Sequence, residues 1–532
     1  MTPSFPQFKF CNEEAKTNQK KMVRHRIKPL SLSPLSSTDD SSSSSEVLDY
    51  EEPVTPAGRL FHRPEMEQVI NCAVGVKNPI ADAEAIKEEI KKSLMIKHPR
   101  FRSVLVRDKS GREHWRRLSH VDLDSHVFVR DVVGSSNRDD DDDDDDEETV
   151  NGYIANLCVS SSLSLDKPLW EFHVLRRQKC LVLRVHHSLG DGISLMSLFL
   201  ACCRKADDPG EIPTIGPTPT QSSSSSRSSK TRPSLSMVSM LRWAWRAVMM
   251  GVLTLVFVLK FVGRALGVKD VKTCISGGDG VELLPRKLAT AKFKLDDLKF
   301  VKNAVSNATI NDVLFGVISS GLSRYLDLKS PNELQEGLEI TGLAMVNLRK
   351  QPGLQELSKL MKDKSSSRWG NKFGFMMVPV YYHKHATRDP LEYVSKAKAT
   401  IDRKKLSLEA HFTYILGYLA MTLLGPKVPA CLNYRIICNT SFTISNIYGP
   451  QEEITCTGNP VTYLRVTSTS LAHAITMHMV SYAGNAEMQV LAAKDIIPEP
   501  KVLAKCFEEA LLEMKSAAQS STDSTLKQLP GH

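Results

Sequence analysis

The hydrophobic pattern of this chain changes between helical and strand-like periods in both of its halves. Apolar residues recur at helical spacing over 82–96 and 311–326, and residues 152–157 indicate a further helix. Short apolar runs predict strands at Arg102–Val106, Val127–Val133, Ile340–Val346, Phe373–Val380, Ser441–Ile447 and Met488–Ala492. Because strands and helices are mixed in each half, the pattern predicts two layered α/β lobes.

Polar, low-complexity segments divide this pattern. Residues 1–48 are polar and contain the run Ser41–Ser45, and residues 205–235 are rich in Pro, Ser and Gly. We therefore expect a disordered tail at 1–48, an N-terminal lobe at 49–205, a linker at 206–236, an apolar and basic segment at 237–268, a C-terminal lobe at 269–515 and a polar tail at 516–532.

The helix over 311–326 has a recognisable start. Thr309 precedes it and Asp312 stands at its third position. This is the spacing of a capping box, in which each side chain binds a backbone amide of the other residue. Asp312 is therefore expected to be structural.

Ten consecutive acidic residues interrupt the N-terminal half at 139–148. Such a block of like charge cannot pack against itself, so we expect a solvated loop. Binding of cations or of a basic partner is the alternative interpretation.

The composition of the 532 residues excludes several classes of protein. Hydrophobic residues make up 41% and charged residues 24%, which excludes a wholly disordered chain. The mean hydropathy of −0.22 excludes a polytopic membrane protein. The eleven cysteines show neither a CxxC pair nor zinc spacing, which favours reduced thiols in a cytosol-facing protein. The N-terminus lacks the apolar core of a secretory signal.

One segment combines a strand, a tight turn and a helix with chemically active side chains. Leu181–His187 has the pattern of a strand and Gly192–Cys203 that of a helix. Side chains alternate along a strand, so His187 shares a face with three aliphatic residues, whereas His186 shares the more polar face with Arg184. A neutral imidazole with a pKa near 6.5 accepts a proton at neutral pH. This position suits His187 as a general base.

The turn after the histidines supplies two further candidates. Asp191 caps the following helix or pairs with a basic group and holds the turn rigid, and Gly192 permits close backbone approach. Packing and metal binding are the alternatives for the His186–His187 pair. A metal would need a third ligand such as His173 or Asp191, and no helical histidine spacing supports it. We therefore expect no metal.

His186–Gly192 resembles the HHxxxDG signature of CoA-dependent acyltransferases. Other matches follow in order, and over about 50–515 the chain is similar to the plant branch of the wax ester synthase/diacylglycerol acyltransferase family. The additional matching segments are Glu52–Pro56, His98–Phe101, Pro168–Trp170, Asn311–Leu314, Val346–Arg349, Gly370–Asn371 and Ser445–Pro450. The DFGWG motif of the BAHD branch is absent from the sequence.

This resemblance implies an α/β fold of two chloramphenicol-acetyltransferase-like lobes, each a mixed sheet with helices, with an active-site tunnel between them. It implies transfer of a long-chain acyl group from acyl-CoA to a fatty alcohol or to diacylglycerol. His187 would act as the general base, supported by His186, without a covalent intermediate, a metal or another cofactor. The alternatives are another alcohol or amine acceptor on the same fold, and a non-catalytic lipid-binding protein.

The resemblance also suggests residues that bind the substrate. Ser445 and Asn446 end a strand at a Gly-Pro turn and are candidates for donors to the oxyanion, with a turn-forming role as the alternative. Pro168, Leu169 and Trp170 would line or shape the acyl channel, with core packing as the alternative.

The net charge of +9 hides an uneven distribution along the chain. Residues 212–269 contain eight basic residues and no acidic one, around the apolar stretch Ala247–Leu259. Trp243 and Trp245 precede this stretch, and Arg242, Arg246, Lys260 and Arg264 flank it. Aromatic and basic flanks around an apolar centre indicate a membrane-seeking helix. The absence of a nucleic-acid-binding motif argues against a nucleic-acid partner.

A single span at 241–266 would put the two lobes on opposite sides of a membrane and separate a shared active site. We therefore expect an interfacial or re-entrant helix on a membrane-associated enzyme that faces the cytosol, at the endoplasmic reticulum, with the plasma membrane as a second location. The apolar stretch Phe412–Leu424 is expected to be a buried core helix, with membrane contact as the alternative. No oligomeric state follows from the sequence.

Overall fold

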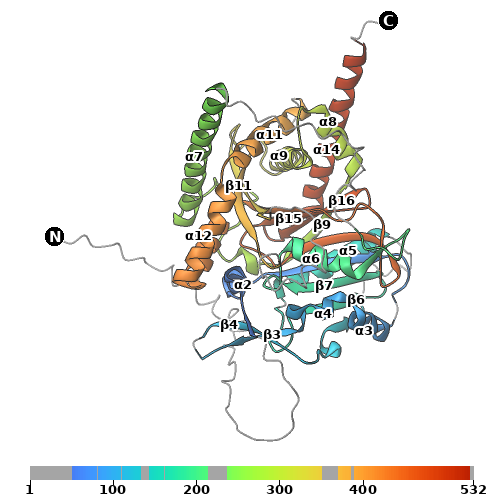
Figure 1. The fold of residues 1–532 in the computed structure, drawn as a ribbon. Coiled ribbons are helices and arrows are strands. Elements are labelled where there is room, and N and C mark those ends of the chain that lie inside the picture. Colours follow the sequence, from blue (N-terminus) through green and yellow to red (C-terminus); the bar gives the residue numbers. More distant parts are fainter. Residues whose placement is uncertain are drawn as a thin grey trace, which may run out of the picture.

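The computed structural model describes residues 51–80, 82–109, 111–132, 143–160, 162–213, 237–349, 369–384 and 389–527. The expected tail at 1–48 and linker residues 214–236 lie outside these ranges. The described chain forms two lobes, with the N-terminal lobe blue and cyan in Figure 1 and the C-terminal lobe yellow to red.

The N-terminal lobe is built on a seven-stranded sheet with the order β5-β6-β7-β2-β14-β13-β8. Its strands are β5 (Val127–Val129), β6 (Trp170–Leu175), β7 (Cys180–His186), β2 (Val69–Val76), β14 (Asn459–Ser468), β13 (Ile454–Cys456) and β8 (Cys203–Lys205). Helices α3 (Ala83–Lys92), α4 (Leu94–Lys97) and α6 (Gly192–Cys202) share a core with one face, and α5 (Asp143–Ser160) packs on the other. A smaller sheet is formed by β1 (Glu51–Pro53), β4 (Glu113–Arg117) and β3 (Ser103–Arg107).

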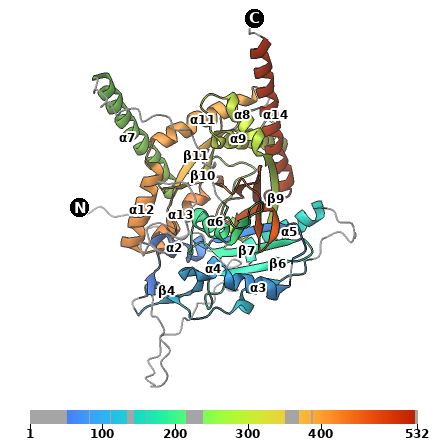
Figure 2. The ribbon, with the colours of Figure 1, turned by 45° about the vertical axis from the view of Figure 1, so that its right-hand side comes forward.

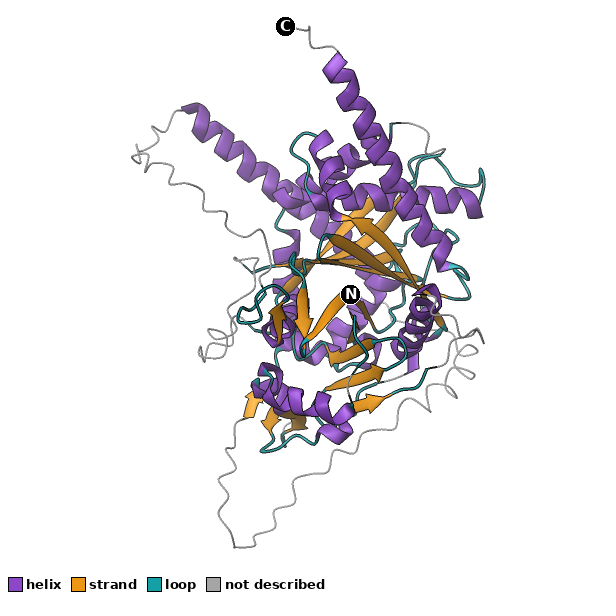
Figure 3. Cartoon of the chain, turned by 90° about the vertical axis from the view of Figure 1, so that its right-hand side faces the viewer, coloured by secondary structure: helices purple, strands orange, loops and turns teal. Residues whose placement is uncertain are grey.

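The C-terminal lobe contains a six-stranded sheet with the order β11-β10-β12-β15-β16-β9. Its strands are β11 (Phe373–Tyr381), β10 (Glu339–Asn347), β12 (Phe442–Ile447), β15 (Ile475–Tyr482), β16 (Asn485–Ala493) and β9 (Arg286–Lys294). One face packs on α8 (Leu295–Ala304), α9 (Ile310–Lys329), α11 (Pro390–Leu406) and α14 (Pro500–Lys527). In Figure 3 this sheet lies between its helical layer and the N-terminal lobe.

A second helical group covers the β11 side of the C-terminal lobe. It consists of α2 (Pro56–Phe61), α7 (Met237–Leu266), α12 (Glu409–Leu424) and α13 (Lys427–Cys438). These helices share a core that includes Leu60, Phe261, Met377, Met421 and Ile436. This group lies beside the candidate site described below.

The C-terminal half of the chain contributes two strands to the N-terminal sheet, which differs from a simple division of the chain at the linker. β13 and β14 follow the linker in the sequence, but β14 pairs with β2 and β13 pairs with β8 in the N-terminal sheet. The aliphatic side chains of Val461, Leu464 and Val466 complete the core of the N-terminal lobe. The N-terminal sheet is therefore completed by the other half of the chain, whereas the C-terminal sheet contains only strands that follow the linker.

Most of the predicted elements are present with shifted ends. The strand predicted at 181–187 is β7, the helix predicted at 192–203 is α6, and the helix predicted at 311–326 is α9. Thr309 and Asp312 form the predicted capping box. The residues predicted to begin a polar tail at 516 instead continue α14 to Lys527, with Ala518 fully buried.

The prediction that the acidic run forms only a solvated loop is wrong for its second half. Residues 143–148 open α5, and residues 139–142 lie outside the described residues. The Glu147 carboxylate binds Arg465 at 2.7 Å and Lys292 at 2.8 Å. Burial alone would raise the pKa of Glu147, but the two cations outweigh it and lower this pKa. Glu147 therefore packs because residues from the C-terminal half of the chain supply opposite charges.

Helix α7 projects from the molecule beside α12 (Figure 2). Among the described residues, one helix, Met240–Leu266, is long and apolar enough to cross a membrane. An 18-residue window within it has a mean hydropathy of 1.9. Only its last turns pack closely, through Phe261 and Ala265. Arg264 does not belong to the outward-facing charges, because its guanidinium binds Asp270 at 2.6 Å.

The expectation that Phe412–Leu424 is a buried core helix is wrong. This segment lies in α12, whose buried side chains are Glu409, Thr413 and Met421. The outer face of α12 exposes Phe412, Ile415, Leu416, Tyr418, Leu419, Leu423 and Leu424. Two adjacent helices thus present unpartnered apolar faces, which is unusual for the surface of a soluble monomer.

Candidate active site

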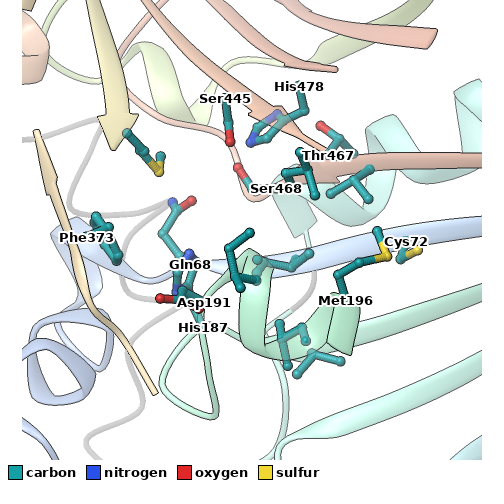
Figure 4. Close-up of a pocket in the computed structure, with 18 of the residues that line it drawn as sticks. Gln68, Cys72, His187, Asp191, Met196, Phe373, Ser445, Thr467, Ser468 and His478 are labelled. Carbon is teal, nitrogen blue, oxygen red and sulfur yellow. The ribbon is translucent and has the colours of Figure 1, made fainter. Parts of the chain in front are cut away.

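His187 lies one residue beyond the end of β7, where the two lobes meet. As strand alternation predicts, it follows Leu183 and Val185 on one face, and all three side chains line a cavity of about 150 Å³. His187 is 8% exposed. Figure 4 shows His187 beside Asp191 on one side of this cavity, with Ser445 and His478 on the other.

Asn371 fixes the tautomer of His187. The Asn371 Nδ2 atom donates to the backbone carbonyl of His187 at 2.8 Å, so the amide oxygen is the atom that faces the ring. This Oδ1 atom lies 2.9 Å from His187 Nδ1. Because an amide oxygen only accepts, Nδ1 carries the proton and Nε2 keeps its lone pair. The unoccupied nitrogen is the one that a general base requires.

The surroundings of His187 favour the neutral ring. Burial lowers the pKa of His187, while the charge of Asp191 and the bond to Asn371 oppose this shift without reversing it. The Phe61 ring stacks on the imidazole with 4.3 Å between centroids. His187 is therefore held as a neutral imidazole at physiological pH.

His186 points away from this cavity. Its Nδ1 atom lies 2.6 Å from Ser188 Oγ, and its ring stacks on His62 at 4.5 Å. The face that it shares with Arg184 is polar but not solvated, because Arg184 is 1% exposed and binds Glu171 at 2.8 Å. Both faces of β7 are thus buried. Of the two histidines, only His187 reaches the cavity.

Asp191 makes both of the contacts that the sequence offers as alternatives. One oxygen accepts from the Ser194 amide at 3.1 Å and caps α6. The other accepts from Arg349 Nη1 at 2.6 Å and from the Lys372 amide at 3.0 Å. Asp191 therefore ties the turn after His187 to the segments that follow β10 and precede β11.

Gly192 lies close to a side chain of the other lobe. A Cβ atom at Gly192 would lie 3.1 Å from Ile447 Cδ1. Ile447 belongs to β12 of the other lobe. Gly192 thus allows α6 to begin directly against the C-terminal sheet.

A second cavity borders the one at His187 on the side of α3 and α4. This cavity of about 380 Å³ shares the walls Leu183, Val185, Leu195 and Phe199 with the first. Its lining is mainly aliphatic and aromatic, and Lys92, Lys97 and Arg204 lie at its edge. This apolar region is large enough to hold much of an extended alkyl chain.

Ser445 and Asn446 line the cavity opposite His187. The Asn446 Nδ2 atom donates to Asn311 Oδ1 at 2.8 Å, which uses one of its donors in contact with α9. Ser445 pairs with His478 in the parallel register of β12 and β15. Of the two residues, Ser445 is the better placed to donate to a bound group.

His478 is a cavity residue that the sequence did not reveal. It is 5% exposed, and its Nδ1 atom has no hydrogen-bond partner among the described residues. Burial and the proximity of His187 lower the pKa of His478 to about 4. Both histidines of the cavity are thus neutral.

Asn371 was matched only as part of a motif, and its contact with His187 spans 184 positions.

Pro168, Leu169 and Trp170 do not line the cavity at His187 or the second cavity. Leu169 and Trp170 are fully buried in the core of the N-terminal lobe. Trp170 Nε1 donates to the Phe101 carbonyl at 2.9 Å, and its ring stacks on His126. Their placement is that of the core-packing alternative.

The described residues contain no group of three or more His, Cys, Asp or Glu side chains placed to hold a metal ion. His173, one of the possible third ligands, instead contacts Tyr153 at 2.6 Å and Glu171 at 3.1 Å.

Comparison with known proteins places this geometry in a family. Residues 59–314 match the model of the wax ester synthase/diacylglycerol acyltransferase catalytic domain, and residues 369–515 match that of the WS/DGAT C-terminal domain. The wax ester synthase/diacylglycerol acyltransferase 5 of Arabidopsis thaliana is 35% identical over 503 residues, covering 90% of this chain and 96% of its own length. The Arabidopsis enzyme numbered 4 is also 35% identical, over 89% of this chain and 92% of its own.

Solved structures share the fold. The wax ester synthase/diacylglycerol acyltransferase from Marinobacter aquaeolei VT8 superposes with a TM-score of 0.54 at 17% identity, covering 88% of this chain and all of that one. Trichothecene 15-O-acetyltransferase from Fusarium sporotrichioides superposes with a TM-score of 0.54 at 12% identity. The superposition covers 90% of this chain and 97% of that one. The predicted two-lobed acyltransferase fold is confirmed. The chain is an O-acyltransferase and belongs to the wax ester synthase/diacylglycerol acyltransferase family.

Proposed function

We propose that this protein transfers a long-chain acyl group from acyl-CoA to the hydroxyl of a fatty alcohol or of diacylglycerol, with His187 as the general base. The observation that carries the proposal is the buried, neutral His187, whose Nδ1–H is held by Asn371 and whose Nε2 is left to accept a proton. The apolar walls around it suit alkyl substrates.

The reaction then needs no covalent enzyme intermediate. His187 Nε2 takes the proton of the acceptor hydroxyl as the oxygen attacks the thioester carbonyl. The tetrahedral oxyanion collapses, the bond to sulfur breaks, and the imidazolium returns its proton to the leaving CoA thiolate. The Ser445 hydroxyl is our first candidate for the donor that stabilises the oxyanion, and Asn446 is the second.

The acyl chain of the donor would extend from the cavity at His187 past Leu195 and Phe199 into the second cavity. This replaces Pro168–Trp170 as the proposed acyl-binding region. Burial of the chain there removes its methylenes from water, at a gain of about 0.8 kcal/mol each.

We also propose that α7 and α12 bind the surface of a membrane, at the cytosolic face of the endoplasmic reticulum, with the plasma membrane as a second location. Trp243, Trp245 and Leu255 on α7 are each at least 60% exposed, and α12 exposes its own apolar face. Arg242 and Arg246 are also exposed and attract anionic lipid headgroups.

The topology supports an interfacial or re-entrant helix over a single span. β8 ends at Lys205 in the N-terminal sheet, and the last turns of α7 pack on the C-terminal lobe. The chain before and after the intervening segment is therefore fixed on one side of any membrane. A crossing by α7 would force the polar segment 214–236 back through hydrocarbon, which is strongly unfavourable.

The experiment that tests the function uses the purified full chain, palmitoyl-CoA and vesicles that contain hexadecanol or dioleoylglycerol. We expect ester from the wild type and a loss of about 10²-fold or more for His187→Ala, with a milder loss for His186→Ala. Equal product from His187→Ala would exclude the base assignment. Vesicle binding without product from any acceptor would favour a non-catalytic lipid-binding protein.

A further inference from the structure

A third cavity, of about 510 Å³, ends against side chains that contact His187. Its inner end is formed by Phe61, Asn371 and Phe373. These side chains surround the imidazole of His187. The ring centroids of Phe61 and Phe373 lie 4.3 Å and 5.8 Å from that of the imidazole, and Asn371 hydrogen-bonds to it. Phe373 lines the first cavity as well, so this side chain stands between the two cavities beside His187.

The outer wall of this cavity is made by α7, α12 and α13. Several of its residues are also exposed on the surface: Leu266 is 70% exposed, Tyr418 is 49% exposed and Leu416 is 39% exposed. The cavity thus meets the surface among apolar side chains, between the two helices whose outer faces lack a protein partner in the described chain. Figure 1 shows α7 and α12 side by side on one flank of the molecule.

The charges around this opening suit a lipid surface. Helix α7 contains no acidic residue. The one acidic residue of α12, Glu409, is 1% exposed and binds Lys404 at 2.7 Å. Lys404 also lies 3.6 Å from the centre of the Phe257 ring of α7. The acid is therefore neutralised internally, and the exposed Arg242 and Arg246 lie several turns away, toward the start of α7.

We infer that this cavity is a lateral portal through which a long-chain acceptor, an alcohol or diacylglycerol dissolved in the membrane, brings its hydroxyl to His187. The inference rests on the proposed function. A chain that entered by this route would pass from lipid into an apolar passage and avoid exposure of its methylenes to water. The donor chain would lie in the first two cavities, so both substrates can be bound together.

Gly417 offers a way to close the portal with little disturbance. It lies within α12 and lines the cavity, and a Cβ atom there would meet nothing within 4 Å. Gly152 is a matched control: it is an exposed glycine within α5, and it also has no neighbour within 4 Å of a Cβ. Gly417→Phe and Gly152→Phe therefore make the same change in a helix, inside and outside the portal.

The test measures ester formation from palmitoyl-CoA with hexadecanol in phosphatidylcholine/phosphatidylserine vesicles and with butanol in solution. We expect Gly417→Phe to lower the hexadecanol-to-butanol rate ratio by about tenfold or more, and Gly152→Phe to leave this ratio at the wild-type value. Leu416→Trp, at a partly exposed position, is expected to act in the same direction. An unchanged ratio in both portal variants would overturn the inference.

A second readout does not depend on turnover. Hexadecanol with a terminal diazirine, irradiated in vesicles with the wild-type chain, is expected to label peptides of α7, α12 or α13. Labelling confined to α3, α4 or α6 would overturn the portal while leaving the acyltransferase proposal intact. Absence of ester from the wild type with both alcohols and with dioleoylglycerol would instead refute the proposed function, and the acceptor route with it.

Discussion

Arg349 and Asp191 form a buried ion pair that joins the two halves of the chain. Arg349 Nη1 lies 2.6 Å from Asp191 Oδ2, and the two side chains are 5% and 7% exposed. Arg349 also donates to the Gly370 carbonyl at 2.7 Å and to Ser194 Oγ at 3.2 Å. The pair thus holds the start of α6 against the segment that carries Asn371, and Asn371 in turn orients His187.

Removal of either member of this pair is expected to destabilise the protein strongly. Arg349→Ala leaves a carboxylate buried without its cation, at a cost of about 3–5 kcal/mol in the free energy of unfolding. Urea unfolding followed by fluorescence measures this change. Lys91→Ala, which removes the exposed pair with Glu88, is the control and should change the midpoint little. A shift as small for Arg349→Ala as for the control would contradict the structural role of the pair.

The pH dependence of the reaction is expected to report the environment of His187. Burial lowers its pKa, so the unprotonated base persists below the usual imidazole range, and the acid limb of kcat/KM should lie below about pH 6.5. Asn371→Asp places a carboxylate beside the ring, which stabilises the imidazolium and raises this pKa. The acid limb should therefore move to higher pH, and kcat should fall because the bond to the His187 carbonyl is lost.

Rate profiles between about pH 5 and 9 measure this shift. Asn446→Asp is a useful comparison, because it adds the same charge to the opposite wall of the cavity. Coincident acid limbs for the wild type and Asn371→Asp would show that a group other than His187 controls the limb.

Ser445→Ala tests the proposed donor to the oxyanion. If its hydroxyl binds the developing charge, its loss should reduce kcat by about 10²–10³-fold with a small change in KM. His478→Asn examines the neighbouring ring, whose Nδ1 atom has no partner in the described part of the chain. An effect of Ser445→Ala on KM alone would assign this residue to substrate binding instead.

Local patterns predicted the elements that carry His187, but not the partners that determine its chemistry. The aliphatic alternation of 181–187 and the Asp-Gly start of α6 are properties of contiguous sequence. Asn371 reaches His187 only after the two lobes assemble. His478 lies on β15, which is buried on both faces and so lacks the alternation that marks a half-buried strand. Its position next to Ser445 is set by the order of strands in the sheet.

The same limit explains the wrong assignments. Apolar composition alone does not distinguish a core helix from one with an exposed apolar face. The sequence of α12 therefore predicts a core helix. Glu147 packs because Arg465, 318 positions away, neutralises it. Trp170 matches a family motif, yet its indole proton is bound by the Phe101 carbonyl within the core. For Glu147 and Trp170, the residues that bind the side chain are distant in the sequence.

The preference for acyl-chain length is expected to depend on the walls shared by the first two cavities. Leu195→Phe would narrow the passage between them and lower activity with palmitoyl-CoA more than with octanoyl-CoA. Competition between the two donors with one alcohol acceptor measures the preference directly. A uniform loss with both donors would indicate damage to α6 rather than a blocked chain.

Membrane binding provides a prediction that is independent of catalysis. Arg242 and Arg246 are exposed on the unpacked part of α7, whereas Arg264 is bound to Asp270. The double change Arg242→Gln/Arg246→Gln removes two charges near the headgroups, and at about 1 kcal/mol each should weaken binding to phosphatidylserine-containing vesicles roughly thirtyfold. Lys501→Gln/Lys505→Gln on α14 removes the same charge from a helix with no exposed aromatic belt, and should bind like the wild type. Flotation of vesicles at low and high salt measures both. If the α14 variant lost as much binding as the α7 variant, net charge rather than the surface of α7 and α12 would be responsible, and the proposed orientation on the membrane would be wrong.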